Sequence, residues 1–231
     1  VREVDYGQYE GKIELISGGP PCQPFSMGGK HKAQADMRDM FPAAIRAVRQ
    51  ARPSAFVFEN VKGLTRASFR NYFEYIKLQL EHPDIVAKPD EDWSEHHARL
   101  ERHHTSGVRS ALRYYVVTRL LNAADYGVPQ RRERIVFVGF RSDLGIKWNF
   151  PAATHSLDAL IWDQTRGDYW DRNSVARKDR VLGARAQARA AKLKERPELA
   201  AWRTVREAIA GLPDAEREPT QALEWLNHRH Q

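Results

Sequence analysis

Apolar positions along the first 150 residues follow two spacings, one typical of strands and one typical of helices. Four short apolar runs indicate buried strands, at residues 13–17, 55–58, 114–121 and 134–139. Two stretches with apolar residues three and four positions apart indicate core-facing helices, around residues 40–52 and 69–80. The predicted order is therefore strand, helix, strand, helix and two further strands.

This order predicts an α/β fold. Strands that alternate with helices pair in parallel through right-handed crossovers, so we expect a mostly parallel, doubly wound, Rossmann-like sheet that is incomplete and has an irregular, helical C-terminal extension. The last two strands have no helix between them and are expected to form a hairpin through residues 125–129. Ligands of such sheets bind at the carboxyl ends of the strands, where Cys22 and Glu59 are expected to share one rim.

The strand pattern ends near residue 150, which predicts a domain boundary. Residues 1–150 form the first domain, and residues 151–231 are interpreted as a linker and part of a second unit. Residues 82–107 are polar and are interpreted as a surface insertion with a helical piece around 93–104. Histidines in this insertion suggest a metal site, but their irregular spacing and the lack of a second cysteine favour a solvated helix: His82, His96, His97, His103 and His104.

Composition narrows the class of protein. The chain of 231 residues is 42% hydrophobic and 29% charged, which is enough for a sizeable core. Its apolar runs are far shorter than the roughly 20 residues of a membrane span, and its first residues lack the pattern of a signal peptide. A single cysteine excludes an internal disulfide. We therefore expect a cytoplasmic protein.

Positive charge is concentrated in one segment. The formal net charge is +7, while residues 172–206 carry 11 basic against 3 acidic residues, so the rest of the chain is nearly neutral. A local basic surface suits a polyanion such as nucleic acid, because neutralised phosphates release their counterions. The composition also predicts a basic helix at about residues 176–196, and a solvated helix surface explains the same charge equally well.

Cys22 stands in a loop rich in glycine and proline, GGPPCQPFS at residues 18–26. Such a loop presents a thiol more readily than it buries one, although a buried structural cysteine is common. A nucleophilic role requires the thiolate, and thus a basic environment that lowers the thiol pKa from about 8.5. Basic residues that could supply it follow closely: Lys30, His31, Lys32 and Arg38. Both interpretations of Cys22 stay open at this level.

Two further groups could take part in chemistry at this rim. Glu59 ends a buried apolar strand, where desolvation would raise its pKa and make it a proton donor near neutral pH, although a capping or salt-bridged carboxylate fits equally well. The sequence QRRER at residues 130–134 precedes the most apolar strand, and alternation directs Arg132 and Arg134 to one side. A guanidinium there can hold a phosphate or a carbonyl oxygen, or belong to a salt-bridge cluster.

In this order and spacing, the motifs resemble those of the bacterial cytosine-5 DNA methyltransferases. Three motifs carry the resemblance: PCQPFS at residues 21–26, ENV at 59–61 and QRRER at 130–134. The sequence DMR at 36–38 fits a smaller motif, and TVREAIAGLP at 204–213 is similar to a stretch near the target-recognition region. Residues 1–150 thus resemble the catalytic half of the family's domain, and residues 151–231 the start of a target-recognition region.

The resemblance implies transfer of a methyl group from S-adenosylmethionine to carbon 5 of cytosine in double-stranded DNA, on a flipped-out base. It implies Cys22 as the nucleophile, Glu59 at ring nitrogen 3 and Arg134 at the carbonyl oxygen of the base. Arg132 is expected to support the catalytic loop or a phosphate. The residues expected to contact DNA are Gln23, Ser26, Lys30, Lys32, Asn60 and Arg132. The residues expected to remain of the cofactor site are Pro20 and Phe41, and no metal ligand is expected.

The sequence departs from the family pattern at the cofactor site. The family's glycine-rich turn, its acidic cofactor ligands and its closing motifs have no match here. We therefore expect either part of a longer enzyme or one chain of a split enzyme, whose partner supplies the cofactor half. By itself the chain is expected to bind S-adenosylmethionine weakly and to be inactive. A catalytically incomplete DNA-binding fragment and an RNA cytosine-5 methyltransferase stay open as alternatives.

Overall fold

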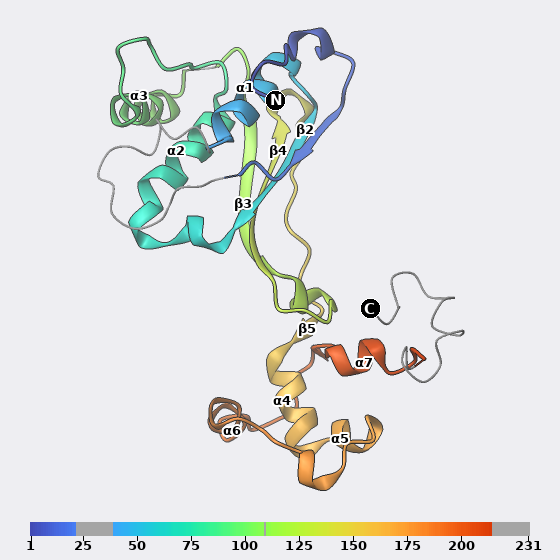
Figure 1. Ribbon diagram of the computed structural model, residues 1–231. Coiled ribbons are helices and arrows are strands. Elements are labelled where there is room, and N and C mark those ends of the chain that lie inside the picture. Colours follow the sequence, from blue (N-terminus) through green and yellow to red (C-terminus); the bar gives the residue numbers. More distant parts are fainter. Residues whose placement is uncertain (22–38, 109, 214–231) are drawn as a thin grey trace. The chain divides into compact units, whose positions relative to one another are not determined.

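The computed structural model describes residues 1–21, 39–108 and 110–213, and the chain divides into two compact units (Figure 1). The first unit comprises residues 1–121 and 133–150, and the second comprises residues 122–132 and 151–231. The sequence-based division at residue 150 did not assign residues 122–132 to the second unit. None of the helices described is both long and apolar enough to cross a bilayer.

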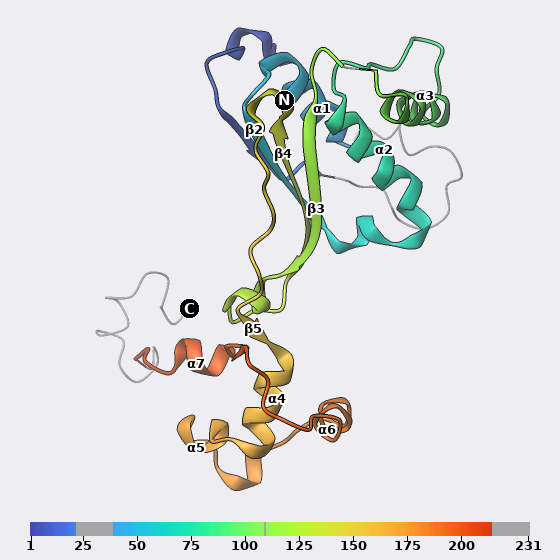
Figure 2. The same cartoon turned by 180° about the vertical axis from the view of Figure 1, so that it is seen from behind.

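The first unit contains every strand and helix that the sequence predicts for residues 1–150. Its elements are β1 Leu15–Gly18, α1 Phe41–Ala51, β2 Ala55–Val61, α2 Arg70–Glu81, α3 Trp93–Ser106, β3 Tyr114–Asn122 and β4 Glu133–Arg141. The α/β class is therefore confirmed. Strands β3 and β4 are neighbours in the sheet, and Figure 2 shows the short connection at residues 123–132 that links them at one end, as expected for a hairpin.

The sheet is mixed rather than mostly parallel. Its strand order is β1-β2-β4-β3. Strands β1 and β2 pair in parallel, with Ile16 opposite Phe56, whereas β2 and β4 pair antiparallel, with Phe56 opposite Gly139. The prediction of a mostly parallel doubly wound sheet is wrong in this respect, because the direct β3–β4 connection reverses the chain and brings β4 back against β2.

Strand β2 is longer than the sequence predicts. The apolar run ends at Phe58, but the strand continues to Val61 because β4 supplies partners: Val136 for Glu59, Ile135 for Asn60 and Arg134 for Val61. Glu59 and Asn60 therefore lie within a paired strand rather than beyond its carboxyl end, which corrects the prediction.

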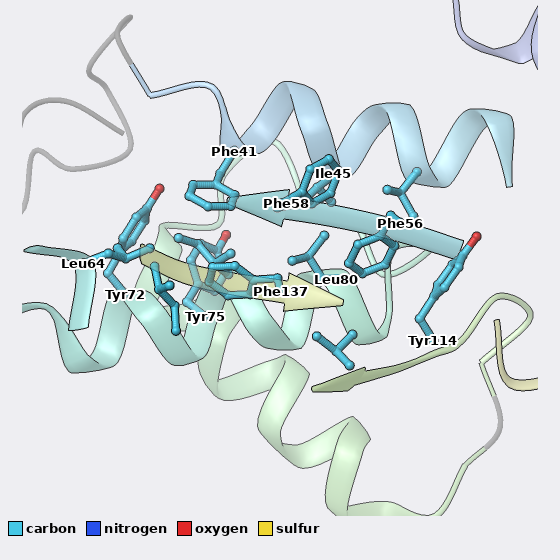
Figure 3. Packing of buried hydrophobic residues seen from close by; sticks show 14 of the residues in the cluster. Phe41, Ile45, Phe56, Phe58, Leu64, Tyr72, Tyr75, Leu80, Tyr114 and Phe137 are labelled. Carbon is cyan, nitrogen blue, oxygen red and sulfur yellow. The ribbon is translucent and has the colours of Figure 1, made fainter. Parts of the chain in front are cut away.

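One hydrophobic core joins the three helices to one face of the sheet. Alternate residues of β2, Phe56 and Phe58, point into it, and Phe137 of β4 lies beside them (Figure 3). Phe41 of α1 packs edge-on against Phe137 at a centroid distance of 5.7 Å. Because side chains alternate along a strand, residues between these positions face the other side of the sheet.

Helix α3 is not the solvated helix that its composition suggests. It begins with a capping box formed by Asp92 and Glu95, and it buries His96 and Leu100 against α2. His96 donates from Nε2 to the carbonyl oxygen of Ile85 at 2.9 Å and accepts at Nδ1 from the Tyr75 hydroxyl at 2.8 Å. Burial lowers the pKa of His96, so the ring is a neutral, fully hydrogen-bonded part of the core.

Gly139 is expected to be required for packing between β2 and β4. A Cβ at this position would overlap the Phe56 ring, which is itself stacked on Phe58. We expect Gly139→Ala to lower the free energy of unfolding by about 1–3 kcal/mol, as overpacked core positions do. Urea unfolding gives this value. Gly63→Ala is the control, because its Cβ would lie 3.8 Å from the nearest atom, and equal midpoints for the two variants would refute this account.

The second unit is made of short elements. They are β5 His155–Ser156, α4 Leu157–Arg166, α5 Tyr169–Arg172, α6 Ala184–Ala190, β6 Ala200–Ala201 and α7 Val205–Ile209. The basic helix predicted at 176–196 is thus reduced to α6. Arg166 donates to the carbonyl oxygen of Ala190, the last residue of α6, at 3.4 Å, and to that of Leu193, three residues further on, at 2.8 Å. Basic side chains commonly satisfy carbonyls near helix ends in this way.

Candidate active site

The sheet register brings Glu59 and Arg134 together. Arg134 lies opposite Val61 in the β2–β4 pair, so its side chain is diagonal to that of Glu59 on the same face. The Arg134 Nε atom lies 2.5 Å from Glu59 Oε1, and Arg134 Nη1 donates to the Glu133 carbonyl oxygen at 2.8 Å. Two motifs that are 75 positions apart in the sequence thus form one ion pair, on the face opposite the core.

The environment of Glu59 differs from the prediction. Its side chain is 42% exposed, and that of Arg134 is 25% exposed. The expected desolvation of Glu59 is therefore absent, because the carboxylate lies on the sheet face away from the aromatic core. The salt-bridged alternative describes its surroundings in this structure, and the partner is the arginine that the family resemblance places at the same base.

The backbone before Cys22 is anchored beside this ion pair. Asn60 is 5% exposed, and its Nδ2 atom donates to the Pro20 carbonyl oxygen at 2.8 Å. A Cβ on Gly19 would lie 3.4 Å from Glu59 Oε2, so the Gly19 backbone passes close to the carboxylate. Asn60 therefore acts as a positioning residue. Its side-chain oxygen accepts from the Val61 amide, so both ends of the side-chain amide form hydrogen bonds within the protein. The DNA contact expected of Asn60 stays a prediction.

Asp39 and Met40, at the start of the next described segment, are also held by hydrogen bonds. The Met40 amide donates to the Pro21 carbonyl oxygen at 2.9 Å, so residues 21 and 40 are adjacent. Asp39 is 5% exposed, accepts from the Phe41 amide at 3.0 Å and accepts a hydrogen bond from the Tyr72 hydroxyl. Sequence reasoning missed Asp39 and Tyr72. The only signal was an aspartate two residues before a helix that starts with Phe-Pro.

Several predicted site residues lie outside the part of the chain that the structure describes. These are Cys22, Gln23, Ser26, Lys30 and Lys32. The two residues proposed for the cofactor, Pro20 and Phe41, are described, and both are buried. Phe41 belongs to the core and has no exposed surface. We therefore assign the Pro20 and Phe41 side chains to packing, because neither offers a surface to a ligand.

Arg132 belongs to the connection between β3 and β4 rather than to the strand. Its backbone amide donates to Asn122 Oδ1 at 3.1 Å, and the residue is exposed. The strand alternation expected for Arg132 and Arg134 does not apply, because β4 begins only at Glu133. An exposed guanidinium on this connection suits a phosphate contact.

Part of the basic segment at residues 172–206 is neutralised within the second unit. Arg172 pairs with Asp163 at 3.2 Å, Asp168 at 2.5 Å and Glu207 at 3.3 Å. Arg189 pairs with Asp158 and holds the pKa of that carboxyl below its usual value. Arg180 and Arg196 also have acidic partners. The cations that form no ion pair with the described residues are Arg177, Lys178, Arg185, Lys192, Lys194, Arg203 and Arg206.

Asn60→Ala is expected to lower the stability of the fold and to slow the methyl transfer that the family resemblance implies. Removing the buried amide leaves the Pro20 carbonyl without its donor, which costs about 1–3 kcal/mol of unfolding free energy. Chemical denaturation measures this loss. Asn60→Asp should lose as much, because a carboxylate cannot donate to a carbonyl oxygen. Unchanged stability in both variants would show that the hydrogen bond does not hold the loop.

The fold and these paired motifs define the class of protein. The sequence model of the C-5 cytosine-specific DNA methylase family matches residues 1–84 and 97–204, so the chain belongs to this family. The resemblance drawn from the three motifs is thereby confirmed.

Individual relatives support the same family. The chain is similar to type II methyltransferase M.AquIA of a Picosynechococcus species, with 39% identity over 62% of this chain and 49% of the relative. It is also similar to M.AplI of Arthrospira platensis, with 35% identity over 67% of this chain and 34% of the relative. M.NgoMIV of Neisseria gonorrhoeae is 32% identical over 70% of this chain and 44% of its own. The chain thus spans between a third and a half of the length of these relatives.

Among solved structures, the chain is similar to two eukaryotic methyltransferases. The Entamoeba histolytica methyltransferase EhMeth gives a TM-score of 0.40 at 16% identity, over 69% of this chain and 42% of its own. The Schizosaccharomyces pombe Dnmt2 methyltransferase gives a TM-score of 0.35 at 18% identity, over 64% of this chain and 36% of its own.

Proposed function

We propose that this chain carries the base-binding and nucleophilic half of an enzyme that methylates carbon 5 of cytosine in double-stranded DNA. Family membership supports this proposal. The observation that carries it is the 2.5 Å contact between Glu59 and Arg134 beside the anchored Gly19–Pro21 backbone. Cys22 is two positions after Pro20 in the sequence, and Asn60 holds the Pro20 carbonyl.

The proposed nucleophile is the Cys22 thiolate. Carbon 5 of cytosine is a weak nucleophile, and addition of the sulfur to carbon 6 turns the ring into an enamine that reacts at carbon 5. Once carbon 5 carries the methyl group, a base removes its proton, the carbon–sulfur bond breaks and the aromatic ring is restored with Cys22 as thiolate. The target base must be flipped out of the duplex for this geometry.

Glu59 and Arg134 are proposed to hold the base during the addition. Negative charge develops on the ring at nitrogen 3 and the carbonyl oxygen when sulfur attacks carbon 6. Glu59 relieves this charge on one side by sharing a proton with nitrogen 3 once the base is bound. Arg134 donates to the carbonyl oxygen on the other, and its contacts with Glu59 and the Glu133 carbonyl fix the guanidinium in place.

The family implies S-adenosylmethionine, which supplies the methyl group as an electrophile. The Pro20 and Phe41 side chains do not fit this cofactor because they are buried. We therefore propose that the cofactor site requires residues other than these, from a further segment or from a second chain. Strand β1 lies at one end of the described sheet order, with Leu15 55% exposed, and is the edge at which such a segment could pair.

DNA is proposed as the substrate over RNA. The relatives named above are type II methyltransferases. Seven cations of residues 172–206 form no ion pair within the described part of the chain, and they suit a phosphate backbone. The test is transfer of a labelled methyl group from S-adenosylmethionine by the intact protein, with any partner chain supplied, to matched pools of duplex DNA and folded RNA. Label in 5-methylcytosine of DNA supports the proposal. Label in RNA alone favours the RNA alternative, and DNA binding without transfer favours the incomplete fragment.

A further inference from the structure

The C-terminal ends of α2 and α3 gather histidines that the proposed reaction does not use. Glu81 is the last residue of α2, His82 follows it, and His104 lies in the last turn of α3. His82 is 2% exposed, while the side chains of Glu81 and His104 are 11% and 39% exposed. One nitrogen or oxygen atom from each lies within 4.8 Å of the others. Residues 22 positions apart therefore meet at one point.

Two of the distances in this cluster match those between the ligands of a metal ion. His82 Nε2 lies 3.1 Å from His104 Nδ1, and His104 Nδ1 lies 3.2 Å from Glu81 Oε2. Ligand atoms at about 2.0–2.1 Å from a tetrahedral zinc ion are about 3.3 Å apart. The other carboxylate oxygen, Glu81 Oε1, is 3.7 Å from Lys77, so Oε2 is the one that faces the histidines.

One ring hydrogen must serve two contacts in this cluster. A ring nitrogen either donates one hydrogen or accepts at one lone pair. If His104 Nδ1 donates, its single hydrogen is shared between Glu81 Oε2 and His82 Nε2. If instead it accepts from His82 Nε2, it presents no hydrogen to the Glu81 carboxylate. A cation between the three atoms would use one lone pair from each.

The surrounding contacts are compatible with the tautomer that a metal requires. His82 Nδ1 is 2.7 Å from Ser110 Oγ, which in turn is 2.9 Å from His103 Nε2. When His82 Nδ1 donates to Ser110, the serine hydroxyl donates to His103, and the lone pair of His82 Nε2 is directed into the cluster. Outer hydrogen bonds of this kind orient metal-bound imidazoles. His96 differs, because both of its nitrogens are engaged by Tyr75 and Ile85.

Solvent can reach the cluster from one side. A groove of about 1240 Å³ between α2 and α3 is lined by both Glu81 and His104. An ion can therefore enter, and a water molecule can complete a fourth coordination position. Two histidines and one glutamate with an open position form a ligand set that zinc adopts in proteins.

We propose that Glu81, His82 and His104 form a zinc site that fastens the end of α2 to the end of α3. The site lies apart from Glu59 and Arg134 in the sequence and does not depend on the proposed methyl transfer. It departs from the expectation that the histidine-rich insertion holds no metal ligand.

The test is zinc binding by the intact protein after removal of metals with a chelator. Isothermal titration with zinc chloride alone should show one equivalent bound. His104→Gln and Glu81→Gln should each abolish this binding, while Ser110→Ala should weaken it by roughly 10- to 100-fold, as loss of an outer partner does. His97→Gln, on the same helix but outside the cluster, is the matched control and should bind zinc like the unaltered protein.

Cobalt(II) provides a second readout that folding alone does not change. A four-coordinate site should produce strong visible absorption that zinc displaces, and circular dichroism of the metal-free variants should show that they are folded. Absence of stoichiometric zinc binding by the unaltered protein would overturn the proposal. Unchanged affinity in folded His104→Gln and Glu81→Gln would also overturn it, because the ion would then bind elsewhere.

Discussion

Cys22→Ser is expected to lower the rate of methyl transfer to DNA by at least about a thousandfold, because a hydroxyl is a far weaker nucleophile than a thiolate at neutral pH. The chain contains a single cysteine, so no other thiol can replace it. The measurement is a single-turnover assay of label incorporated into DNA, with S-adenosylmethionine and any partner chain at saturating concentration.

The same variant should bind DNA with an affinity close to that of the unaltered protein. Loss of one sulfur atom leaves the phosphate contacts intact, so anisotropy with labelled duplex separates chemistry from binding. A Cys22→Ser enzyme that retains the original rate would show that the reaction does not proceed through a cysteine adduct.

Arg134→Ala is expected to slow methyl transfer by about 100- to 1000-fold while leaving the fold nearly as stable. Removing one preorganised donor from a developing oxyanion has effects of this size. The Glu59–Arg134 pair is partly exposed, so its contribution to stability should be under about 1 kcal/mol. Single-turnover rates and urea unfolding, measured on the same preparation, test both halves of the prediction. Arg134→Lys should also be impaired, because an ammonium lacks the planar fork.

Lys62→Gln is the matched control for this prediction. Lys62 pairs with Glu133, the residue before Arg134, at a distance of 2.7 Å. The Lys62 side chain is 53% exposed. It should leave the rate unchanged. If Arg134→Ala and Lys62→Gln have equal rates, Arg134 serves only as a surface ion pair.

Elements with a clear apolar period could be predicted from the sequence. Helices α1 and α2 lie within a residue or two of their predicted positions, since Phe41, Ile45, Tyr72 and Ile76 all face the core. The end of β2 could not be predicted, because residues 59–61 are held in the strand by β4, more than 70 positions away. The long basic helix was also wrong, because only residues 184–190 of the predicted 176–196 form α6, and helix propensity alone does not fix where a short helix begins and ends.

At the candidate site, the motifs could be predicted from the sequence but the surroundings of their residues could not. The three motifs were sufficient to recognise the family and to associate Glu59 with Arg134. The surroundings of Glu59 were not predictable, because which face of β2 points away from the core depends on how the helices pack. The sequence analysis considered His82 and His104 as metal ligands and set them aside for their irregular spacing. It did not include Glu81, because the cluster is assembled from two helix ends.

The proposed methyl transfer requires a covalent bond between Cys22 and carbon 6 of cytosine. Duplex DNA with 5-fluorocytosine tests this bond. Carbon 5 of this base carries fluorine in place of the hydrogen that must be removed as a proton, so the adduct persists after methylation. A pool of duplexes with this base at every cytosine of one strand removes the need to know the target sequence. The intact protein, with S-adenosylmethionine and any partner chain, should yield a protease-resistant nucleotide adduct on the peptide containing Cys22. Methylation of ordinary cytosine by the same preparation, with no adduct on that peptide, would contradict the proposed mechanism.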